Sequence, residues 1–259
     1  MHPIAFEFSG LTIHSYGVMV ALGFLAGIWT ASRRCLRENI SPERILDLGP
    51  WLIVGAILGA RTLYVTTFWR EQFAGRGILP MLAVWRGGLV FYGGLIGACL
   101  ACLLYAHLRK LPLWKLADIL APSIPLGQAF GRIGCFLNGC CYGRACSMPW
   151  AVRFPANNLN GAPSTPVHPT EIYSALLNFG LYLALARLFR RKRFDGQVFA
   201  VYLVSYALLR SFVEFFRGDY PANQYLFGVL SPGQVVSIPT LAAGLILLGL
   251  LPRLARKMV

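Results

Sequence analysis

Residues 88–106 have the sequence GLVFYGGLIGACLACLLYA, which contains no Asp, Glu, Lys or Arg. A transmembrane α-helix needs roughly 20 mostly apolar residues, so this stretch alone is long enough to cross a bilayer. Similar apolar runs recur along the chain, and we interpret them as spans at residues 14–32, 46–69, 88–106, 117–138, 170–186, 197–216 and 233–252. The sequence therefore predicts an all-α polytopic membrane protein with about seven transmembrane helices in a single domain, 1–259.

The composition supports this interpretation. Of the 259 residues, 56% are hydrophobic and only 13% are charged. A soluble domain usually has about 25% charged residues, so the composition is typical of a membrane-embedded chain and not of a soluble one.

The formal net charge of +14 could indicate a nucleic-acid partner, but the placement of the basic residues indicates topology instead. Most Lys and Arg residues lie in four loops on one side of the predicted spans, namely 33–45, 107–116, 187–196 and 253–259. An excess of Lys and Arg marks the cytoplasmic side of a membrane. We therefore predict an N-terminus outside, a cytoplasmic C-terminus and no nucleic-acid partner.

The fourth predicted span, 117–138, is interrupted by proline and glycine residues, among them Pro122 and Pro125. Broken helices occur at membrane depth where they are buried or line a polar cavity. The longest loop follows, at about 139–169, and the charge count places it outside. A loop of this length is often functional. We predict that it forms a small extracytoplasmic cap in which residues such as Trp150 and Phe154 pack together.

Three arginines, Arg61, Arg132 and Arg210, fall inside predicted spans. A charged side chain is costly in hydrocarbon, so each is expected to face a cavity or a fixed partner. One interpretation is structural, with each guanidinium paired to an acidic residue or a lipid headgroup. The other is an anion pocket, because a guanidinium can bind phosphate oxygens through two parallel hydrogen bonds. In a membrane the anion would be a phospholipid phosphate, and on this ground we predict Arg61 as a substrate-binding residue.

The segment YALLRSFVEFFR places Arg210, Glu214 and Arg217 at the spacing i, i+4, i+7. On a continuous helix these side chains share one face. Glu214 would then hold the two arginines in register, either as an ion-pair ladder at the helix end or as the support of a phosphate site.

Four of the seven cysteines lie in the stretch GCFLNGCCYGRAC, residues 134–146. Their spacing is not a usual zinc pattern. If the stretch lies outside, disulfides between some of them are expected, with a metal site as the lesser alternative. The chain also has no acidic cluster that would hold magnesium.

Several motifs resemble the prolipoprotein diacylglyceryl transferase family. They are RGGLVFYGGLIGACL, DILAPSIPLGQAFGRIGCFLNGCCYGR, HPTEIY and YALLRSFVEFFRGD, and they occur in the family's order over nearly the whole chain. The resemblance implies a bacterial, multi-pass enzyme of the cytoplasmic (inner) membrane whose active site lies towards the extracytoplasmic side. Such an enzyme transfers the diacylglyceryl group of phosphatidylglycerol to the lipobox cysteine of a prolipoprotein, releases glycerol phosphate and needs no cofactor. From the residues themselves we predict no metal ligands.

The resemblance also implies roles for individual residues. Arg132 and Arg210 match the family's essential arginines and are predicted to be catalytic. Tyr92 stands where the family's best-studied pattern, HGGLIG, has a histidine to which the role of base is assigned. His168 opens the HP motif, so both residues are further catalytic candidates. The predicted substrate-binding residues, besides Arg61, are those that match the family's other motif positions, namely Tyr16, Asn138, Gly143, Glu214 and Arg217. The family often has asparagine where Cys135 stands and glutamate where Cys140 stands.

The identity of the base stays open at this point. Free cysteine has a pKa of about 8.5 and tyrosine of about 10, so Tyr92 is a weak base unless nearby cations lower its pKa. His168 and His14 are alternatives, and a cationic pocket alone would also favour a thiolate. Two competing functions also remain. One is a phosphatidylglycerol-dependent transferase with a different acceptor, and the other is a non-enzymatic lipid-binding or transport protein.

Overall fold

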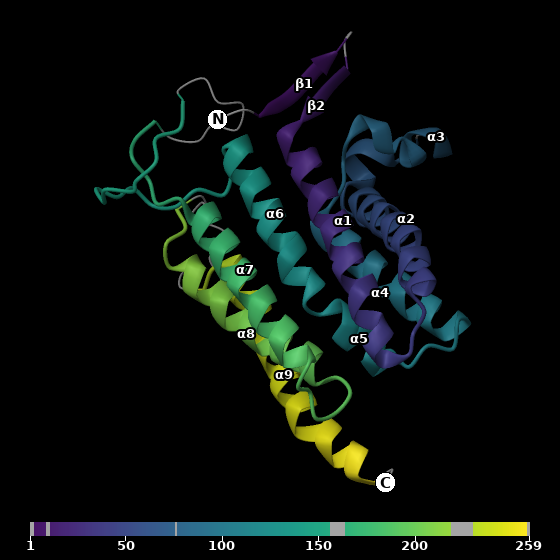
Figure 1. Cartoon of the computed structure of the whole chain (residues 1–259). Helices are drawn as coiled ribbons and strands as arrows, with labels where there is room; N and C mark the ends of the chain where they lie inside the picture. The colour runs from purple at the N-terminus through teal and green to yellow at the C-terminus, as the bar shows by residue number, and fades with distance from the viewer. Residues whose placement is uncertain (1–2, 9–10, 76, 156–163, 219–229, 258–259) are drawn as a thin grey trace. The chain divides into compact units, whose positions relative to one another are not determined.

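The computed structural model of the chain describes residues 3–8, 11–75, 77–155, 164–218 and 230–257. Its long helices are α1 (Ser15–Cys35), α2 (Pro42–Thr67), α4 (Phe91–Leu108), α6 (Ser123–Asn138), α7 (Thr170–Phe189), α8 (Gln197–Glu214) and α9 (Pro232–Lys257) (Figure 1). The short elements are β1 (Ile4–Phe8), β2 (Leu11–His14), η1 (Leu36–Glu38), the π-helix η2 (Trp69–Phe73), α3 (Ile78–Leu82), η3 (Val84–Arg86) and α5 (Leu113–Leu120).

Six helices among the described residues are long and apolar enough to cross a membrane: Ser15–Glu38, Pro42–Thr67, Phe91–Leu108, Thr170–Phe189, Gln197–Glu214 and Pro232–Leu254. The prediction of a mostly helical polytopic membrane protein is thereby confirmed. The structure adds an antiparallel hairpin that the all-α prediction did not include, in which β1 pairs with β2.

The remaining predicted span, 117–138, is divided between α5 and α6, as its prolines indicated. The break falls at Ala121 and Pro122, where two turn residues separate the helices. Proline has no N–H to donate to the preceding turn, so it ends one helix and is tolerated at the start of the next. With 16 residues, α6 is shorter than a complete span.

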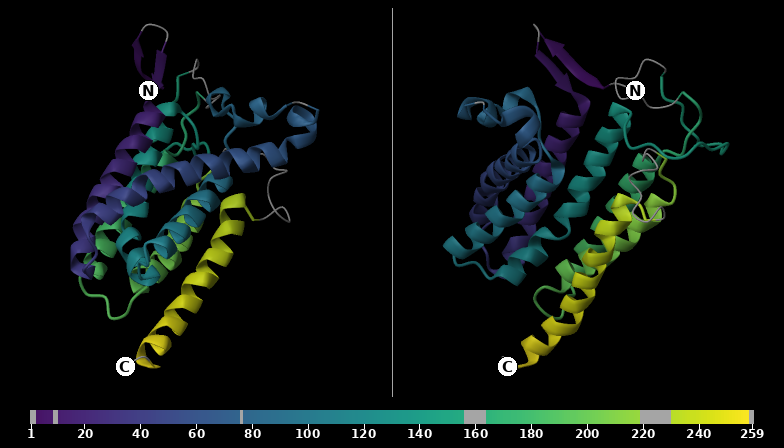
Figure 2. Two further views of the ribbon diagram at one scale, coloured as in Figure 1. Left: turned by 90° about the vertical axis from the view of Figure 1, so that its right-hand side faces the viewer. Right: turned by 180° about the vertical axis from the view of Figure 1, so that it is seen from behind.

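The chain falls into two compact units. One unit comprises Met1–Ala31 and Ala117–Val259, and the other comprises Ser32–Leu116. In the first unit, α6 packs on α7, α7 on α8, and α8 on α9. Figures 1 and 2 show α7, α8 and α9 running side by side. Since consecutive helices run in opposite directions, the end of α6, the start of α7 and the end of α8 meet at the same end of the unit.

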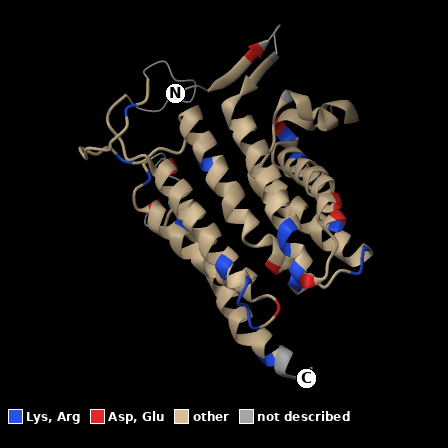
Figure 3. Ribbon diagram, viewed as in Figure 1, with Lys and Arg blue, Asp and Glu red and all other residues tan. Residues whose placement is uncertain are grey.

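The opposite end of this unit carries most of its positive charge. Figure 3 shows Lys and Arg gathered at the connection between α7 and α8 and near the end of α9. Asp118 of α5 anchors this connection, because its buried carboxylate forms an ion pair with Lys192 at 3.0 Å. The same carboxylate accepts hydrogen bonds from three backbone N–H groups at the start of α8, those of Gly196, Val198 and Phe199. These donors have no partner within their own helix, so Asp118 caps α8.

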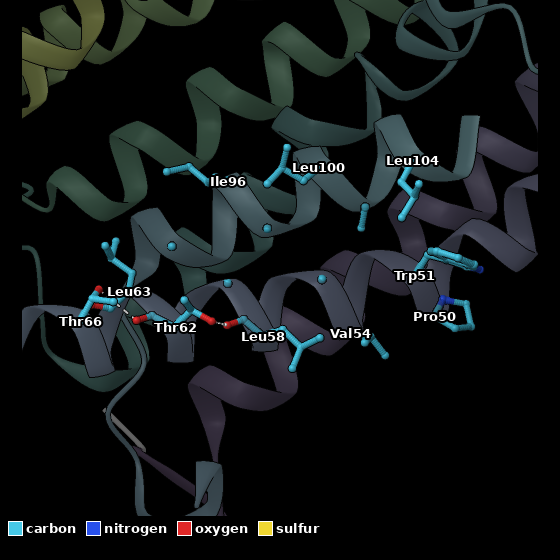
Figure 4. Close-up of a pocket in the computed structure, with 15 residues that line it drawn as sticks. Pro50, Trp51, Val54, Leu58, Thr62, Leu63, Thr66, Ile96, Leu100 and Leu104 are labelled. Carbon is cyan, nitrogen blue, oxygen red and sulfur yellow. Dashed lines mark hydrogen bonds between the residues drawn. The ribbon is translucent and has the colours of Figure 1, made fainter. Parts of the chain in front are cut away.

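The second unit is built on a close crossing of α2 and α4. Gly55 and Gly59 of α2 face Gly93 and Gly97 of α4, so closely that a Cβ atom on Gly97 would meet the carbonyl oxygen of Gly55. Small residues allow membrane helices to approach in this way. Beside the crossing lies an apolar groove of about 760 Å³, shown in Figure 4, whose walls are formed by both helices.

We expect Gly97→Ala to destabilise the second unit. The added methyl has no space against the carbonyl of Gly55, and overpacking of this kind costs about 1–3 kcal/mol. Gly249→Ala is the matched control, because a Cβ at Gly249 meets nothing within 4 Å. Thermal unfolding of the purified protein in detergent should show a lower midpoint for Gly97→Ala only. Equal midpoints for the two variants would contradict the close crossing.

Candidate functional site

The candidate site lies at the end of the first unit where α6 ends, α7 begins and α8 ends. The loop that joins α6 to α7 is folded over this end. Its residues Phe154 and Val167 are almost completely buried, and Tyr142 packs against them. The predicted packing of Phe154 is therefore observed, whereas Trp150 is 56% exposed. Residues 156–163 of the predicted cap lie outside the described part of the chain.

Gly143 lies at the centre of the folded loop. Its N–H donates to the carbonyl of His168 at 2.9 Å, and the next N–H, of Arg144, donates to the carbonyl of Phe216 at 2.8 Å. The loop thus runs between the segment before α7 and the segment after α8. A Cβ on Gly143 would lie 2.6 Å from the Cβ of His168 and 2.7 Å from the carbonyl oxygen of Phe216. Only glycine fits this junction, which gives a physical reason for the predicted importance of Gly143.

Arg132 and Arg217 have two electrostatic neighbours in common, the carboxyl of Glu171 and the thiol of Cys141. Arg132 is the only Lys or Arg of α6, and Figure 3 shows one blue band on that helix. Arg217 is 5% exposed. Two guanidiniums thus lie near one buried carboxyl and one partly buried thiol.

Glu171, in the first turn of α7, was not among the predicted site residues. It is fully buried, and neither carboxyl oxygen has a hydrogen-bond partner among the described residues. A buried carboxyl in this condition is costly and is often functional. Its neighbour Thr170 donates from Oγ1 to the carbonyl of Cys141 at 2.7 Å, which ties the start of α7 to the cysteine-rich loop.

Arg210 and Glu214 form an ion pair on α8, with 3.1 Å between Nη2 and Oε2. Glu214 is 4% exposed, so the pair is largely shielded from water. We predicted that Arg210, Glu214 and Arg217 share one face of a helix, and this prediction is wrong for Arg217. The helix ends at Glu214, and Arg217 pairs with Gly143 in an antiparallel β-bridge. The chain leaves the helix here because its backbone bonds to the loop instead.

Three cysteines come together where the chain reverses after α6. The Sγ atoms of Cys135, Cys140 and Cys141 all lie within 4.8 Å of one another. Asn138, a predicted substrate-binding residue, donates from Nδ2 to the Sγ of Cys140 at 3.9 Å. The described cysteines are free thiols, so the expected disulfides among residues 135, 140, 141 and 146 are not formed in this structure.

Tyr16, the tyrosine of the first predicted span, lies close to the cluster of three cysteines. Arg132 and the three thiols act on its phenol electrostatically. A Cβ on Gly134 would lie 3.2 Å from the Tyr16 ring, so α1 packs directly over the end of α6.

His168 belongs to an aromatic cluster beside the loop junction. Its Nδ1 lies 3.2 Å from the hydroxyl of Tyr173, and that hydroxyl also accepts a hydrogen bond from Nε1 of Trp150 at 2.7 Å. The His168 ring contacts Phe216 edge-on at 5.4 Å between centroids. These contacts fix the orientation of the imidazole within the first unit.

Arg61 and Tyr92 belong to the second unit. The guanidinium of Arg61 donates to four backbone carbonyls, those of Pro80, Met81, Gly87 and Gly88. These contacts hold the segment between α2 and α4 and favour the structural interpretation of Arg61, while its role in lipid binding stays a prediction. Tyr92 is 48% exposed and contacts the ring of Phe91.

The first unit therefore brings Tyr16, Arg132, Gly143, His168 and Arg217 close to one helix end, together with Asn138. Three of the four crowded cysteines lie there too, and so does Glu171, which was not among the residues predicted from the sequence. Such a site can bind an anion through guanidiniums in a low-dielectric setting, where charge-assisted hydrogen bonds are strong. Fold and site together define a polytopic membrane protein with a group of buried and partly buried charged side chains and thiols at the ends of its helices.

Comparisons with known proteins specify the family. A family model described as prolipoprotein diacylglyceryl transferase matches residues 3–250, and the chain belongs to this family. The chain is 37% identical over 246 residues to a phosphatidylglycerol–prolipoprotein diacylglyceryl transferase of Clostridium tetani, a match that covers 95% of this chain and 96% of that protein. It is 36% identical over 254 residues to a protein of the same name from Geobacter sulfurreducens, with 97% and 95% covered. Relatives of this name also include one from Synechococcus elongatus, 37% identical over 252 residues, with 94% and 85% covered.

Proposed function

We propose that this chain transfers the diacylglyceryl group of phosphatidylglycerol to the lipobox cysteine of a prolipoprotein and releases glycerol phosphate. The observation that carries the proposal is the pair of guanidiniums, Arg132 and Arg217, that share Glu171 and Cys141 as neighbours at one helix end. Family membership and the names of the relatives support the same activity. The enzyme's partners are then phosphatidylglycerol, the prolipoprotein signal peptide and the bilayer.

The topology follows the charge distribution. We place the N-terminus outside and the C-terminus in the cytoplasm of a bacterial cell, with α6 as the seventh, shortened crossing in the inner membrane. In the first unit the basic connection between α7 and α8 lies at the end opposite to the site. Since basic loops stay in the cytoplasm, we place the site and the predicted cap, 139–169, on the extracytoplasmic side.

In the reaction, the acceptor thiolate attacks the glycerol carbon that bears the phosphate. The S–C bond forms, the C–O bond breaks, and the electron pair leaves on the oxygen of glycerol phosphate. We assign the stabilisation of the charge that grows on this leaving group to Arg132 and Arg210, which match the family's essential arginines. Arg217 lies near Glu171 together with Arg132. Glu214 orients Arg210 through their ion pair, while Arg217, Asn138 and Tyr16 contribute to binding of the lipid headgroup.

The proton of the acceptor thiol needs a base, and the contacts favour His168 over Tyr92. His168 lies beside the Gly143 junction with its ring held by Tyr173 and Phe216. Removing a general base typically costs about 10²- to 10⁴-fold in rate. We therefore expect His168→Ala to lower kcat within that range and Tyr92→Phe to leave it nearly unchanged. Steady-state transfer rates of the two variants decide which residue is the base. A larger loss of kcat in Tyr92→Phe than in His168→Ala would assign the base to Tyr92.

The function itself is tested by mass spectrometry. The purified chain is incubated with a synthetic lipobox peptide in vesicles that contain phosphatidylglycerol. We expect the peptide to gain the mass of one diacylglyceryl group, and a peptide with Cys replaced by Ser to gain nothing. Consumption of phosphatidylglycerol without peptide modification would indicate a transferase with another acceptor. If neither lipid nor peptide changes, a non-enzymatic lipid-binding or transport role replaces the proposal.

A further inference from the structure

The thiol cluster of Cys135, Cys140 and Cys141 is not used by the proposed reaction, in which the nucleophile comes from the acceptor. We propose that these three cysteines bind one thiophilic d¹⁰ cation, such as Zn²⁺, through three thiolates and leave a fourth position open to an external thiol. The inference starts from the mutual approach of the three Sγ atoms to within 4.8 Å.

The observed sulfur separations are close to those that a single ion requires. Zinc binds thiolate sulfur at about 2.3 Å in tetrahedral geometry, which places two such sulfurs about 3.8 Å apart. The cluster needs to contract by about 1 Å at most to reach this separation. Rotation about the Cα–Cβ bonds of partly buried cysteines provides a movement of this size.

The backbone holds the three donors in place. Helix α6 ends at Asn138, and Gly139 follows in the left-handed conformation with φ of 72°. The N–H of Cys140 donates back to the carbonyl of Cys135 at 3.1 Å, so the chain reverses over the last helical turn. Cys141 also has a positive φ, 71°, and its carbonyl is held by Thr170. This reversal brings together cysteines whose spacing in the sequence is not a usual zinc pattern.

The charges around the cluster suit a thiolate site. Arg217 and Arg132 are electrostatic neighbours of the Cys141 thiol. Three thiolates and one divalent cation together carry one net negative charge, which these guanidiniums offset. The amide of Asn138 donates to the sulfur of Cys140, an outer-shell contact of the kind that tunes metal-bound thiolates.

The number of donors indicates an open position. Among the described residues, the group contains three ligands, and Cys146 is not one of them. Structural zinc sites have four protein ligands, whereas catalytic sites have three and keep one position for water or substrate. Here the inference rests on the proposed function, in which the external thiol is the acceptor cysteine. A coordinated thiol is held deprotonated, and its proton passes to His168 or to water before the S–C bond forms.

Cadmium titration tests the site. The reduced, chelator-treated protein in detergent is titrated with Cd²⁺, and the sulfur-to-cadmium charge-transfer absorption is recorded. We expect an endpoint of one Cd²⁺ per chain. Cys135→Ser, Cys140→Ser and Cys141→Ser should each weaken binding by more than about 100-fold, beyond the loss that an outer-shell change causes. Cys146→Ser is the matched control and should bind like the unaltered chain. Adding 2-mercaptoethanol should increase the charge-transfer absorption, as a fourth sulfur binds.

Other outcomes overturn the proposal. Cd²⁺ absorption that survives any one of the three substitutions would show that the cluster is not the site. If the mass of the isolated protein is lower by two hydrogens, and if reductant restores these hydrogens, the cysteines form a disulfide and do not bind a metal. Unchanged helix content by circular dichroism separates loss of binding from loss of folding. Peptide transfer without Cd²⁺ binding would rule out the metal site and leave the proposed function standing. Cd²⁺ binding without peptide transfer would support the metal site and rule out the proposed function.

Discussion

Replacing Arg132 by glutamine should lower the rate of diacylglyceryl transfer by about 100- to 1000-fold, the loss typical for removal of one group that stabilises developing negative charge. Arg132→Lys keeps the charge but loses the paired hydrogen bonds to phosphate, so it should recover only part of the rate. Arg153→Gln is the matched control, because Arg153 is an exposed arginine of the folded loop. Equal rates for Arg132→Gln and Arg153→Gln would contradict the proposed role.

Arg210→Gln should lower the transfer rate by a similar factor. For this residue a control is needed that separates loss of activity from loss of stability. Neutralising Arg210 leaves the carboxylate of Glu214 buried without its ion-pair partner, which commonly costs about 3–5 kcal/mol in stability. The double variant Arg210→Gln with Glu214→Gln removes both charges and should restore the unfolding temperature. Activity should stay low in the double variant. Recovery of activity along with stability would mean that Arg210 acts only through the fold.

Gly143→Ala should reduce transfer by about 100-fold, because a displacement of about 1 Å at a site can cost that much. The added methyl would meet the side chain and carbonyl of His168 and the carbonyl of Phe216. It therefore pushes apart the two segments that carry His168 and Arg217. Gly180→Ala is the matched control, because a Cβ at Gly180 meets nothing within 4 Å.

The Gly143 effect should appear in kcat more than in the thermal midpoint, since the residues that meet at this junction, 142–144, 168 and 216–218, lie outside the long helices. Transfer kinetics and thermal unfolding of the same preparations provide the two readouts. Full activity of Gly143→Ala would show that the loop junction does not position the site.

Much of the helical fold could be predicted from the sequence, because long apolar runs have few alternatives in a membrane. The break in the fourth run followed from Pro122, which cannot donate a helical hydrogen bond. The hairpin β1–β2 was missed, although residues 4–8 and 11–14 are short and rich in β-branched and aromatic side chains, which is a strand signal. The strand signal of such short segments is weak compared with the signal of the adjoining apolar span.

The site was predictable only in part. Arg132 and Arg210 were predictable because a charged side chain within a membrane span is energetically costly and therefore often functional. The end of α8 at Glu214 was not predictable, because it is set by backbone hydrogen bonds between residues 142–144 and 216–218, which no local sequence pattern reveals. Glu171 is a lone carboxylate at a helix start, where acidic residues are common. The thiol cluster depends on the left-handed reversal at Gly139. The crowding of cysteines in residues 134–146 drew attention to this stretch, and the Asn-Gly pair after an apolar run was the signal for the reversal that brings three of them together.

The central claim is that guanidiniums bind the phosphate of the lipid headgroup. The most direct test is the affinity for a phosphatidylglycerol analogue in which a methylene replaces the oxygen that would leave, so that no reaction follows binding. Binding is measured in detergent micelles, with diacylglycerol as the uncharged control. A hydrogen bond to a charged group is worth about 1.5–3 kcal/mol, so Arg132→Gln should weaken analogue binding at least about tenfold. Diacylglycerol binding should not change. Undiminished binding of the analogue by the Arg132→Gln, Arg210→Gln double variant would contradict the account.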